Sequence, residues 1–390
     1  MRRLLVVLVV THLAMAPAPA YAADVAWDQW KTFAGVFDAD GTRSDGSLTV
    51  AGSAALYRVD PSGTVTPFAR GPGGYHDDPN TEAYLAVSPG GHVTAAGCSF
   101  VPDETFLLRV HAPLGVTRVT AAGEASGSFA SVKGATALDG IAFDSTGDFD
   151  HRLLVSGQSS GKTVIFAIDC SGAVQVITRT APALEGGLAV APNTFGSFGG
   201  ALIAPDELSG KIYAITKSGA VSIVAKPALA AGPDTGVESV GFVPPGFVGR
   251  GGAVYYADRL TPKNPHPGND RLLRLTSAEL VAAGVQDGDL LAATEGGAKM
   301  VAVRCASSCS VIPVVSKGTN AHGEGHIAFT VQAARASPTP TVPSASPQPS
   351  VTVQRAEFAG SLGAPAAALV ILLALIGLVG VWAIRRRRGR

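Results

Sequence analysis

Five acidic residues stand at the start of short apolar segments that recur along the chain. They are separated by 57, 46, 53 and 86 residues, and they are Glu82, Asp139, Glu185, Glu238 and Glu324. If the segments are strands that meet at one end, the carboxylates converge and repel one another, and a bound cation relieves that repulsion. Carboxylate oxygens suit a divalent cation such as calcium. The alternative is that these acids only end turns and face solvent.

A second candidate set lies in the run His322-Gly-Glu-Gly-His326. Alternate residues of an extended chain point to one face, so both histidines and Glu324 could converge. Two imidazoles and a carboxylate suit zinc or another transition metal. The glycines alternatively serve only to turn the chain into a last strand. Asn193 and Asp206 are further oxygen donors whose direction the sequence does not fix.

Two motifs that resemble catalytic signatures fail on their context. Gly157-Gln-Ser-Ser-Gly161 fits G-x-S-x-G, but a nucleophilic Ser159 would need a strand-to-helix turn, and this segment links two strand-like runs. Gly161-Lys-Thr163 lacks the earlier glycine and the following helix of a phosphate-binding loop. The catalytic residues are therefore unknown, and the sequence favours a binding role over catalysis.

The elements that would position the acids are β-hairpins. Each is an apolar run, a polar turn centred on glycine and a second apolar run, and they span Leu56–Phe68, Leu107–Val119, Val164–Ile177 and Ile212–Val224. Such a pattern is typical of a hairpin. An acid-led segment and a further strand-like run precede most of them, so the repeating unit has about four strands.

Four-stranded units repeated at this spacing predict an all-β, six-bladed β-propeller over residues 23–332. The sixth unit is a degenerate one around 289–293 and 299–303. We expect the strand at 324–329 to complete the N-terminal unit at 48–68, so that strands from the two ends of the chain pair and close the ring. A β-sandwich is the alternative fold.

The phrase Glu185-Gly-Gly-Leu-Ala-Val-Ala-Pro192, with Gly200-Ala-Leu-Ile-Ala204 and Gly210-Lys-Ile-Tyr-Ala-Ile215, resembles six-bladed propellers of the NHL and regucalcin/gluconolactonase-like kind. The resemblance covers roughly residues 34 to 331. It implies the architecture, and in the hydrolases of that kind a divalent metal is held in the channel by acids and amides. It is poor evidence for activity, because such folds serve hydrolases, lyases and binding modules.

The two ends of the chain predict an exported, membrane-anchored protein. Residues 1–22 have the charged start, apolar run and Ala-Tyr-Ala site of a signal peptide. A Pro/Ser/Thr-rich stretch at 333–361 predicts a disordered stalk. The uncharged stretch at 362–384 is long enough to be a single transmembrane helix, and the basic tail at 385–390 would remain cytoplasmic. The remainder of the chain would then lie outside the cell membrane.

Charge and cysteine content restrict the partners. The formal net charge is zero, but seven of the 30 basic residues lie in the two termini, at 2–3, 385–388 and 390, which leaves 23 basic against 30 acidic residues in between. That excess argues against a nucleic-acid partner. The four cysteines, Cys98, Cys170, Cys305 and Cys309, favour disulfides or free thiols over a zinc site. In the disulfide interpretation Cys305 pairs with Cys309, and Cys98 pairs with Cys170.

Three functions follow as expectations. The first is a propeller that presents a recognition face to an extracellular ligand, which is a carbohydrate, a protein or a small molecule. The second is a metal-dependent hydrolase of lactones or esters that uses the channel acids. The third is a structural protein of the cell envelope. If three or more of the five acids point into one cavity, the metal-dependent enzyme is favoured.

Overall fold

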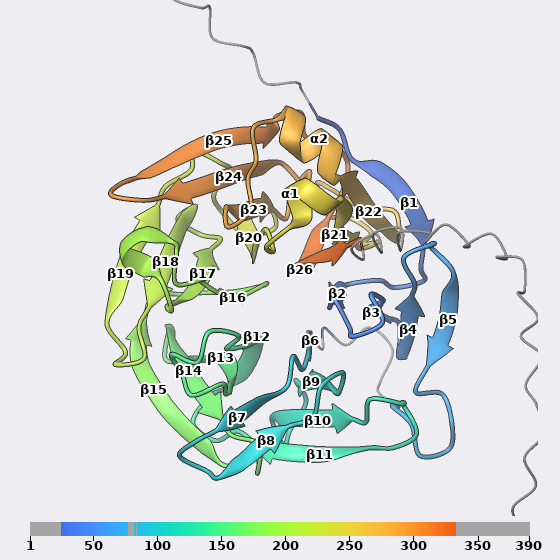
Figure 1. Cartoon of the computed structure of the whole chain (residues 1–390), viewed down its shortest axis with the longest axis vertical. Coiled ribbons are helices and arrows are strands. Elements are labelled where there is room, and N and C mark those ends of the chain that lie inside the picture. Colours follow the sequence, from blue (N-terminus) through green and yellow to red (C-terminus); the bar gives the residue numbers. More distant parts are fainter. Residues whose placement is uncertain (1–24, 77–81, 83, 333–390) are drawn as a thin grey trace, which may run out of the picture. The chain divides into compact units, whose positions relative to one another are not determined.

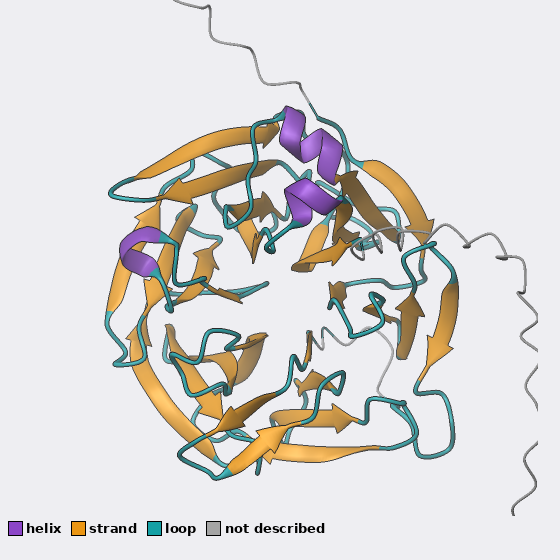
Figure 2. Ribbon diagram, in the orientation of Figure 1, coloured by secondary structure: helices purple, strands orange, loops and turns teal. Residues whose placement is uncertain are grey.

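A computed structural model of the chain describes residues 25–76, 82 and 84–332. Six four-stranded antiparallel sheets are arranged as blades around a common centre (Figures 1 and 2), so the predicted six-bladed β-propeller is confirmed. The predicted signal peptide, stalk, transmembrane helix and basic tail lie outside these residues. Within the described residues no helix is long and apolar enough to cross a membrane.

The first four blades follow the chain in order. Blade 1 consists of β2 (Asp38–Asp40), β3 (Leu48–Gly52), β4 (Ala55–Val59) and β5 (Val65–Phe68). Blade 2 consists of β6 (Leu85–Val87), β9 (Thr105–Arg109), β10 (Gly115–Val119) and β11 (Ser126–Ser131). Blade 3 consists of β12 (Ala137–Phe143), β13 (Leu153–Ser159), β14 (Lys162–Ile168) and β15 (Val174–Ala181). Blade 4 consists of β16 (Ala189–Val190), β17 (Leu202–Asp206), β18 (Lys211–Ile215) and β19 (Val221–Ala225).

Blades 5 and 6 are interleaved along the chain. Blade 5 consists of β20 (Val237–Phe242), β23 (Leu290–Thr294), β24 (Met300–Cys305) and β25 (Cys309–Val315). Blade 6 consists of β26 (Gly323–Val331), β21 (Gly252–Asp258), β22 (Arg271–Thr276) and β1 (Asp28–Thr32). The small elements outside the blades are a hairpin of β7 (Gly91–Val93) and β8 (Cys98–Phe100), a 3-10 turn (Gly196–Phe198), and the helices α1 (Phe247–Arg250) and α2 (Ser277–Ala282).

Both ends of the described chain contribute to one blade, but not through the strands that the sequence predicted. The strand at 324–329 does not complete the unit at 48–68, because that unit has its own inner strand, β2. The C-terminal β26 instead pairs with β21, and β1 pairs with β22 at the outer edge of the same sheet. The prediction missed β2 because Asp38-Ala-Asp40 is too short and polar to be recognised as a strand.

All four predicted hairpins are present, and their turns show why the repeat is visible in the sequence. In the turn between β4 and β5, Asp60 Oδ1 accepts hydrogen bonds from the backbone nitrogens of Ser62 and Thr64, and Gly63 has a φ of +86°. Asp169 makes the equivalent bonds between β14 and β15. A glycine is favoured at positive φ because it has no Cβ.

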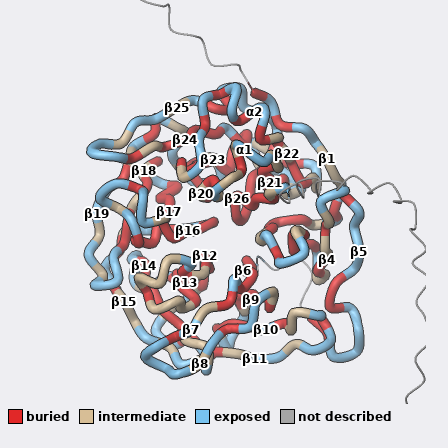
Figure 3. Tube along the Cα trace, viewed as in Figure 1, coloured by how far each residue is buried: buried red, intermediate tan, exposed pale blue. Residues whose placement is uncertain are grey.

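The core lies between neighbouring blades and around the inner strands. Figure 3 shows mostly buried residues near the centre of the ring and mostly exposed ones on the outer strands. Phe100, Phe106 and Phe143 pack edge to face between blades 2 and 3, with ring centroids 5.0 to 5.6 Å apart. The predicted disulfides Cys98–Cys170 and Cys305–Cys309 are both present.

Candidate functional site

Antiparallel pairing within each blade places side chains at one opening of the central channel, the mouth of the ring. The inner strand of a blade begins at the end where its neighbour, the second strand, finishes. Residues just before or at the start of an inner strand therefore meet residues at the end of a second strand. Glu238 and Glu324 reach this mouth from inner strands β20 and β26, whereas Glu207 and Glu295 reach it just after second strands β17 and β23.

The mouth holds a cavity of about 620 Å³ that is rich in carboxyl groups. Its two cationic residues are Lys162 and Arg259, and its eight acidic residues are Glu82, Glu185, Asp206, Glu207, Asp234, Glu238, Glu295 and Glu324. Four of the five predicted acids thus line one cavity. The fifth, Asp139, lies next to it, because its carbonyl accepts a hydrogen bond from the backbone nitrogen of Gly186 and its charge acts on Glu185.

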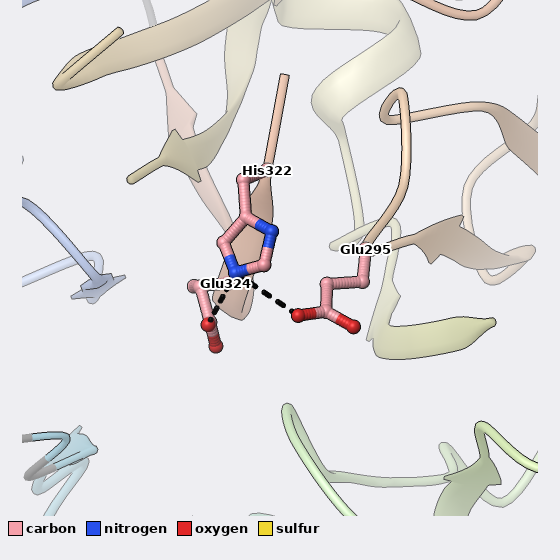
Figure 4. A group of neighbouring side chains, drawn as sticks. All are labelled: Glu295, His322 and Glu324. Carbon is pink, nitrogen blue, oxygen red and sulfur yellow. Dashed lines mark ion pairs between the residues drawn. The ribbon is translucent and has the colours of Figure 1, made fainter. Parts of the chain in front are cut away.

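Three buried side chains form the tightest cluster of possible metal ligands among the described residues (Figure 4): Glu295, His322 and Glu324. Nε2 of His322 lies 3.0 Å from Oε1 of Glu295 and 3.2 Å from Oε1 of Glu324. One candidate ligand atom from each residue lies within 4.8 Å of the others. Two carboxylate oxygens and one imidazole nitrogen can bind a divalent metal ion.

The cluster contains His322 and Glu324 of the predicted His-Gly-Glu-Gly-His set, but His326 is elsewhere. The alternation of β26 is broken at Gly325, which has a φ of +70° and sits in an irregular stretch of the pairing with β21. A Cβ at this position would lie 2.3 Å from Oδ1 of Asp38. The extra residue turns His326 away from Glu324, so the predicted convergence of all three side chains is wrong.

His326 instead joins three blades and lines a different pocket. Its Nδ1 lies 3.0 Å from Oδ1 of Asp38 on β2, and its Nε2 lies 2.6 Å from the carbonyl oxygen of Ile141 on β12. A carbonyl can only accept, so Nε2 carries a proton. Burial opposes the charged form, but the charge and hydrogen bond of Asp38 prevail and raise the pKa of His326 to about 9.

Tyr84 connects two of the acids. Its hydroxyl lies 2.7 Å from Oε2 of Glu324 and 3.2 Å from Oε1 of Glu238. Burial, followed by the charges of Glu324 and Glu238, raises the pKa of the phenol well above its usual value, so the hydroxyl keeps its proton and donates. Arg259 also approaches this group, with its guanidinium 3.5 Å from Oε1 of Glu324 and in direct contact with Glu82.

Burial, together with the crowding of carboxyl groups, raises the pKa values of several acids in this group. Burial, then the neighbouring charges of Asp139 and Glu207, raise the pKa of Glu185 to about 7. Burial also raises the pKa of Asp139 to about 7. Burial, the charge of Glu324 and a hydrogen bond with Glu207 raise the pKa of Glu295 to about 10. A dication at the mouth would offset this repulsion.

The donor set fits a metal ion, and within the described residues its histidine lacks the outer hydrogen bond that is usual for a metal ligand. His322 is only 2% exposed, and its Nδ1 has no hydrogen-bond partner within the described part of the chain. Ligating imidazoles usually donate this second nitrogen to an acceptor that fixes the ring. Here the ring is instead held by burial and by the two carboxylates at Nε2.

Glu295, Glu207, Tyr84 and Arg259 were not predicted from the sequence. The sequence pattern singles out acids that lead an inner strand, whereas Glu207, Glu295 and Arg259 each follow the end of a second strand, β17, β23 and β21. A charged residue at the end of the second apolar run was the available signal. Of the two further oxygen donors named from the sequence, Asp206 lines the cavity. Asn193 lines a different pocket, at the opposite ends of the inner strands.

The chain is similar to known proteins in fold only. No protein-family model matches the chain, and no curated protein matches it. Among solved structures, virginiamycin B lyase from Staphylococcus aureus is 15% identical with a TM-score of 0.41, covering 76% of this chain and 92% of that one. A protein provisionally described as a gluconolactonase is 10% identical with a TM-score of 0.41, covering 76% and 84%.

An auxiliary nutrient binding protein from Bacteroides ovatus is 12% identical with a TM-score of 0.44, covering 80% of this chain and 67% of that one. At these identities the likeness concerns the fold alone. The six blades themselves confirm the architecture that the resemblance to NHL and regucalcin/gluconolactonase-like propellers implied.

Proposed function

We propose that the protein is a metal-dependent hydrolase of small esters or lactones, with its active site in the acidic cavity. The observation that carries the proposal is the cluster of Glu295, His322 and Glu324 at the edge of that cavity. Its volume of about 620 Å³ is in the range of small-molecule sites. Four of the five predicted acids line it, which meets the condition stated above for the metal-dependent enzyme.

Glu295, His322 and Glu324 would hold the ion. Calcium was expected from carboxylates alone, but an imidazole ligand favours a transition-metal dication such as Zn²⁺ or Mn²⁺. A bound dication supplies Lewis acidity toward a carbonyl oxygen and lowers the pKa of a bound water. Tyr84 hydrogen-bonds to Glu324, and Glu207 hydrogen-bonds to Glu295. Both would therefore orient the carboxylate ligands.

Glu185 is the best candidate for a general base. Its side chain is accessible to water in the open cavity, and its pKa of about 7 allows it to accept a proton near neutral pH. It would take the proton of the water that attacks the carbonyl, and it would then give that proton to the leaving alkoxide. Arg259, whose guanidinium lies beside Glu324, is placed to stabilise negative charge that develops on the substrate.

Recognition without catalysis is the second candidate. The sequence supports export, a stalk and a membrane anchor, which together suit a cell-surface propeller that presents a ligand-binding mouth. In that case the same dication would bridge the protein and an extracellular ligand. The two candidates differ in turnover and share the metal site.

The test is metal content and turnover of the purified full-length protein. After treatment with EDTA, Zn²⁺, Mn²⁺ or Ca²⁺ is restored, bound metal is quantified by mass spectrometry, and hydrolysis of phenyl acetate and δ-valerolactone is followed. We expect about one ion per chain and metal-dependent turnover. Glu324→Gln and His322→Ala should lose both, whereas His111→Asn, which alters an exposed histidine, should lose neither.

A protein that binds none of the three ions would contradict the proposal. Metal binding without turnover of either compound would reject the hydrolase and leave metal-dependent recognition. Circular dichroism of each variant separates loss of the site from loss of the fold.

A further inference from the structure

The charge of the cavity exceeds what one dication neutralises. Its eight acidic residues outnumber its two cationic residues by six when all are ionised. With Glu295 and Glu324 ionised as ligands, a dication would offset two of these charges, and protons on Glu185 and Glu238 would offset at most two more, so the cavity keeps a negative charge. A cavity of this charge attracts cations and repels anions.

Two of the acids, Glu207 and Asp234, lie near the candidate ligand Glu295, since the charges of both act on its carboxyl group. Glu207 follows β17, and the exposed Asp234 lies in the loop between β19 and β20. Asp234 Oδ1 accepts a hydrogen bond from Nδ2 of Asn264 at 3.1 Å, and no described ion pair engages Asp234. Its carboxylate is available to a positively charged ligand.

An exposed apolar side chain lies at the same mouth. Leu208, which is 57% exposed, lines the cavity beside Glu207. Covering this side chain with an apolar group removes it from water and favours binding. Glu295, His322 and Glu324 line the same cavity, so a ligand held by Leu208 and the acids would lie beside the candidate metal site.

We propose that this mouth selects cationic amphiphiles: small molecules with a protonated amine at one end and an apolar group at the other. The inference rests on the proposed function and names its substrate class, an ester or lactone that carries such an amine. The amine lies toward Asp234 and Glu207, and the apolar group lies against Leu208. The ester or lactone carbonyl then faces the metal cluster.

The test is isothermal titration calorimetry of the full-length protein with three compounds of equal size: 3-phenylpropylamine, 3-phenylpropan-1-ol and 3-phenylpropanoate. Each is titrated in EDTA and again with Zn²⁺. We expect the amine to bind at least about tenfold more tightly than the alcohol, and the carboxylate not to bind. Raising the salt from 20 to 500 mM should reduce the preference for the amine, because the ions screen the cavity charge.

Two variants that spare the candidate metal ligands test the placement. Asparagine tolerates the backbone at residue 234, whose φ is 60°. Asp234→Asn should therefore weaken binding of the amine about fivefold without affecting binding of the alcohol. Leu208→Ser should weaken binding of both the amine and the alcohol. Glu124→Gln, at an exposed acid outside the cavity, should change neither. An equal affinity for amine and alcohol, or a preference that both lining variants leave intact, would overturn the inference.

The outcomes separate this inference from the proposed function. Amine preference in EDTA, together with no metal binding and no hydrolysis, would retain the ligand class and reject the hydrolase. Metal-dependent hydrolysis of neutral esters without any amine preference would retain the hydrolase and reject this inference.

Discussion

The imidazole of His326 lies 3.0 Å from the carboxylate of Asp38, a residue 288 positions earlier in the chain. Asp38 belongs to the inner strand of blade 1, and His326 to that of blade 6. The same carboxylate accepts hydrogen bonds from the backbone nitrogens of His326 and Leu85. This pair joins the last inner strand to the first, where the ring closes.

Removing either partner of this pair should destabilise the propeller. Both side chains are buried, with Asp38 0% and His326 6% exposed. A buried ion pair that loses one member leaves an uncompensated charge, which costs about 3–5 kcal/mol. We expect Asp38→Asn and His326→Ala each to lower the free energy of urea unfolding by about that amount. A loss no larger than that of the exposed control His111→Ala would contradict this role.

The same pair predicts a dependence of stability on pH. Because the folded protein raises the pKa of His326 from 6.5 to about 9, the folded state holds the proton more tightly than the unfolded state. This contribution is fully present below about pH 6.5 and is lost as the pH rises through about 9. The difference in melting temperature between the parent protein and His326→Gln should therefore shrink from pH 6 to pH 10. A constant difference would rule out a charged His326.

Burial of Glu185 and repulsion at the mouth predict that Glu185→Gln stabilises the metal-free protein. The folded-state pKa of Glu185, about 7, exceeds the ordinary value of 4.5. The stability that its proton contributes is present below about pH 4.5 and is lost as the pH rises through about 7. At pH 8 the variant should gain about 0.5–1 kcal/mol, a discounted figure because solvent screens this accessible carboxylate. Zn²⁺ or Mn²⁺ should reduce the gain, and a variant less stable than its parent in EDTA would refute the repulsion.

Metal binding should release protons. Glu295, whose pKa is raised to about 10, holds a proton at neutral pH and must lose it to act as a ligand. Titration calorimetry with Zn²⁺ in two buffers of different ionisation enthalpy measures that release. We expect about one proton per ion and weaker binding at pH 6 than at pH 8. Buffer-independent heats at pH 7 would show that Glu295 is already ionised or does not bind the metal.

The two disulfides should differ in their effect on stability. Cys98–Cys170 closes a loop of 72 residues between the β7–β8 hairpin and blade 3, whereas Cys305–Cys309 closes one of four. Because longer loops lose more entropy, replacing the first pair by serine should cost about 2–4 kcal/mol and replacing the second about 1–2 kcal/mol. Thermal unfolding of the two double variants tests the order, and a larger loss from the short loop would reverse it.

The sequence alone determined the repeating architecture. Hairpin turns such as that at Asp60 and Gly63 depend on local residues, since a side chain caps its own turn and a glycine adopts positive φ. They can therefore be recognised in the sequence without knowledge of the fold. The apolar inner strands led by acids are likewise local patterns. They correctly placed Glu82, Glu185, Glu238 and Glu324 around one cavity.

Only the tertiary structure decided the composition of the candidate site. Glu295 joins Glu324 because β23 pairs with β20 while β26 pairs with β21, an interleaving that depends on contacts far apart in the chain. His326 leaves the cluster because Gly325 breaks the alternation of β26 against Asp38. Long-range pairing and a single irregular residue leave little trace in local sequence, since both are set by the packing of blades against each other.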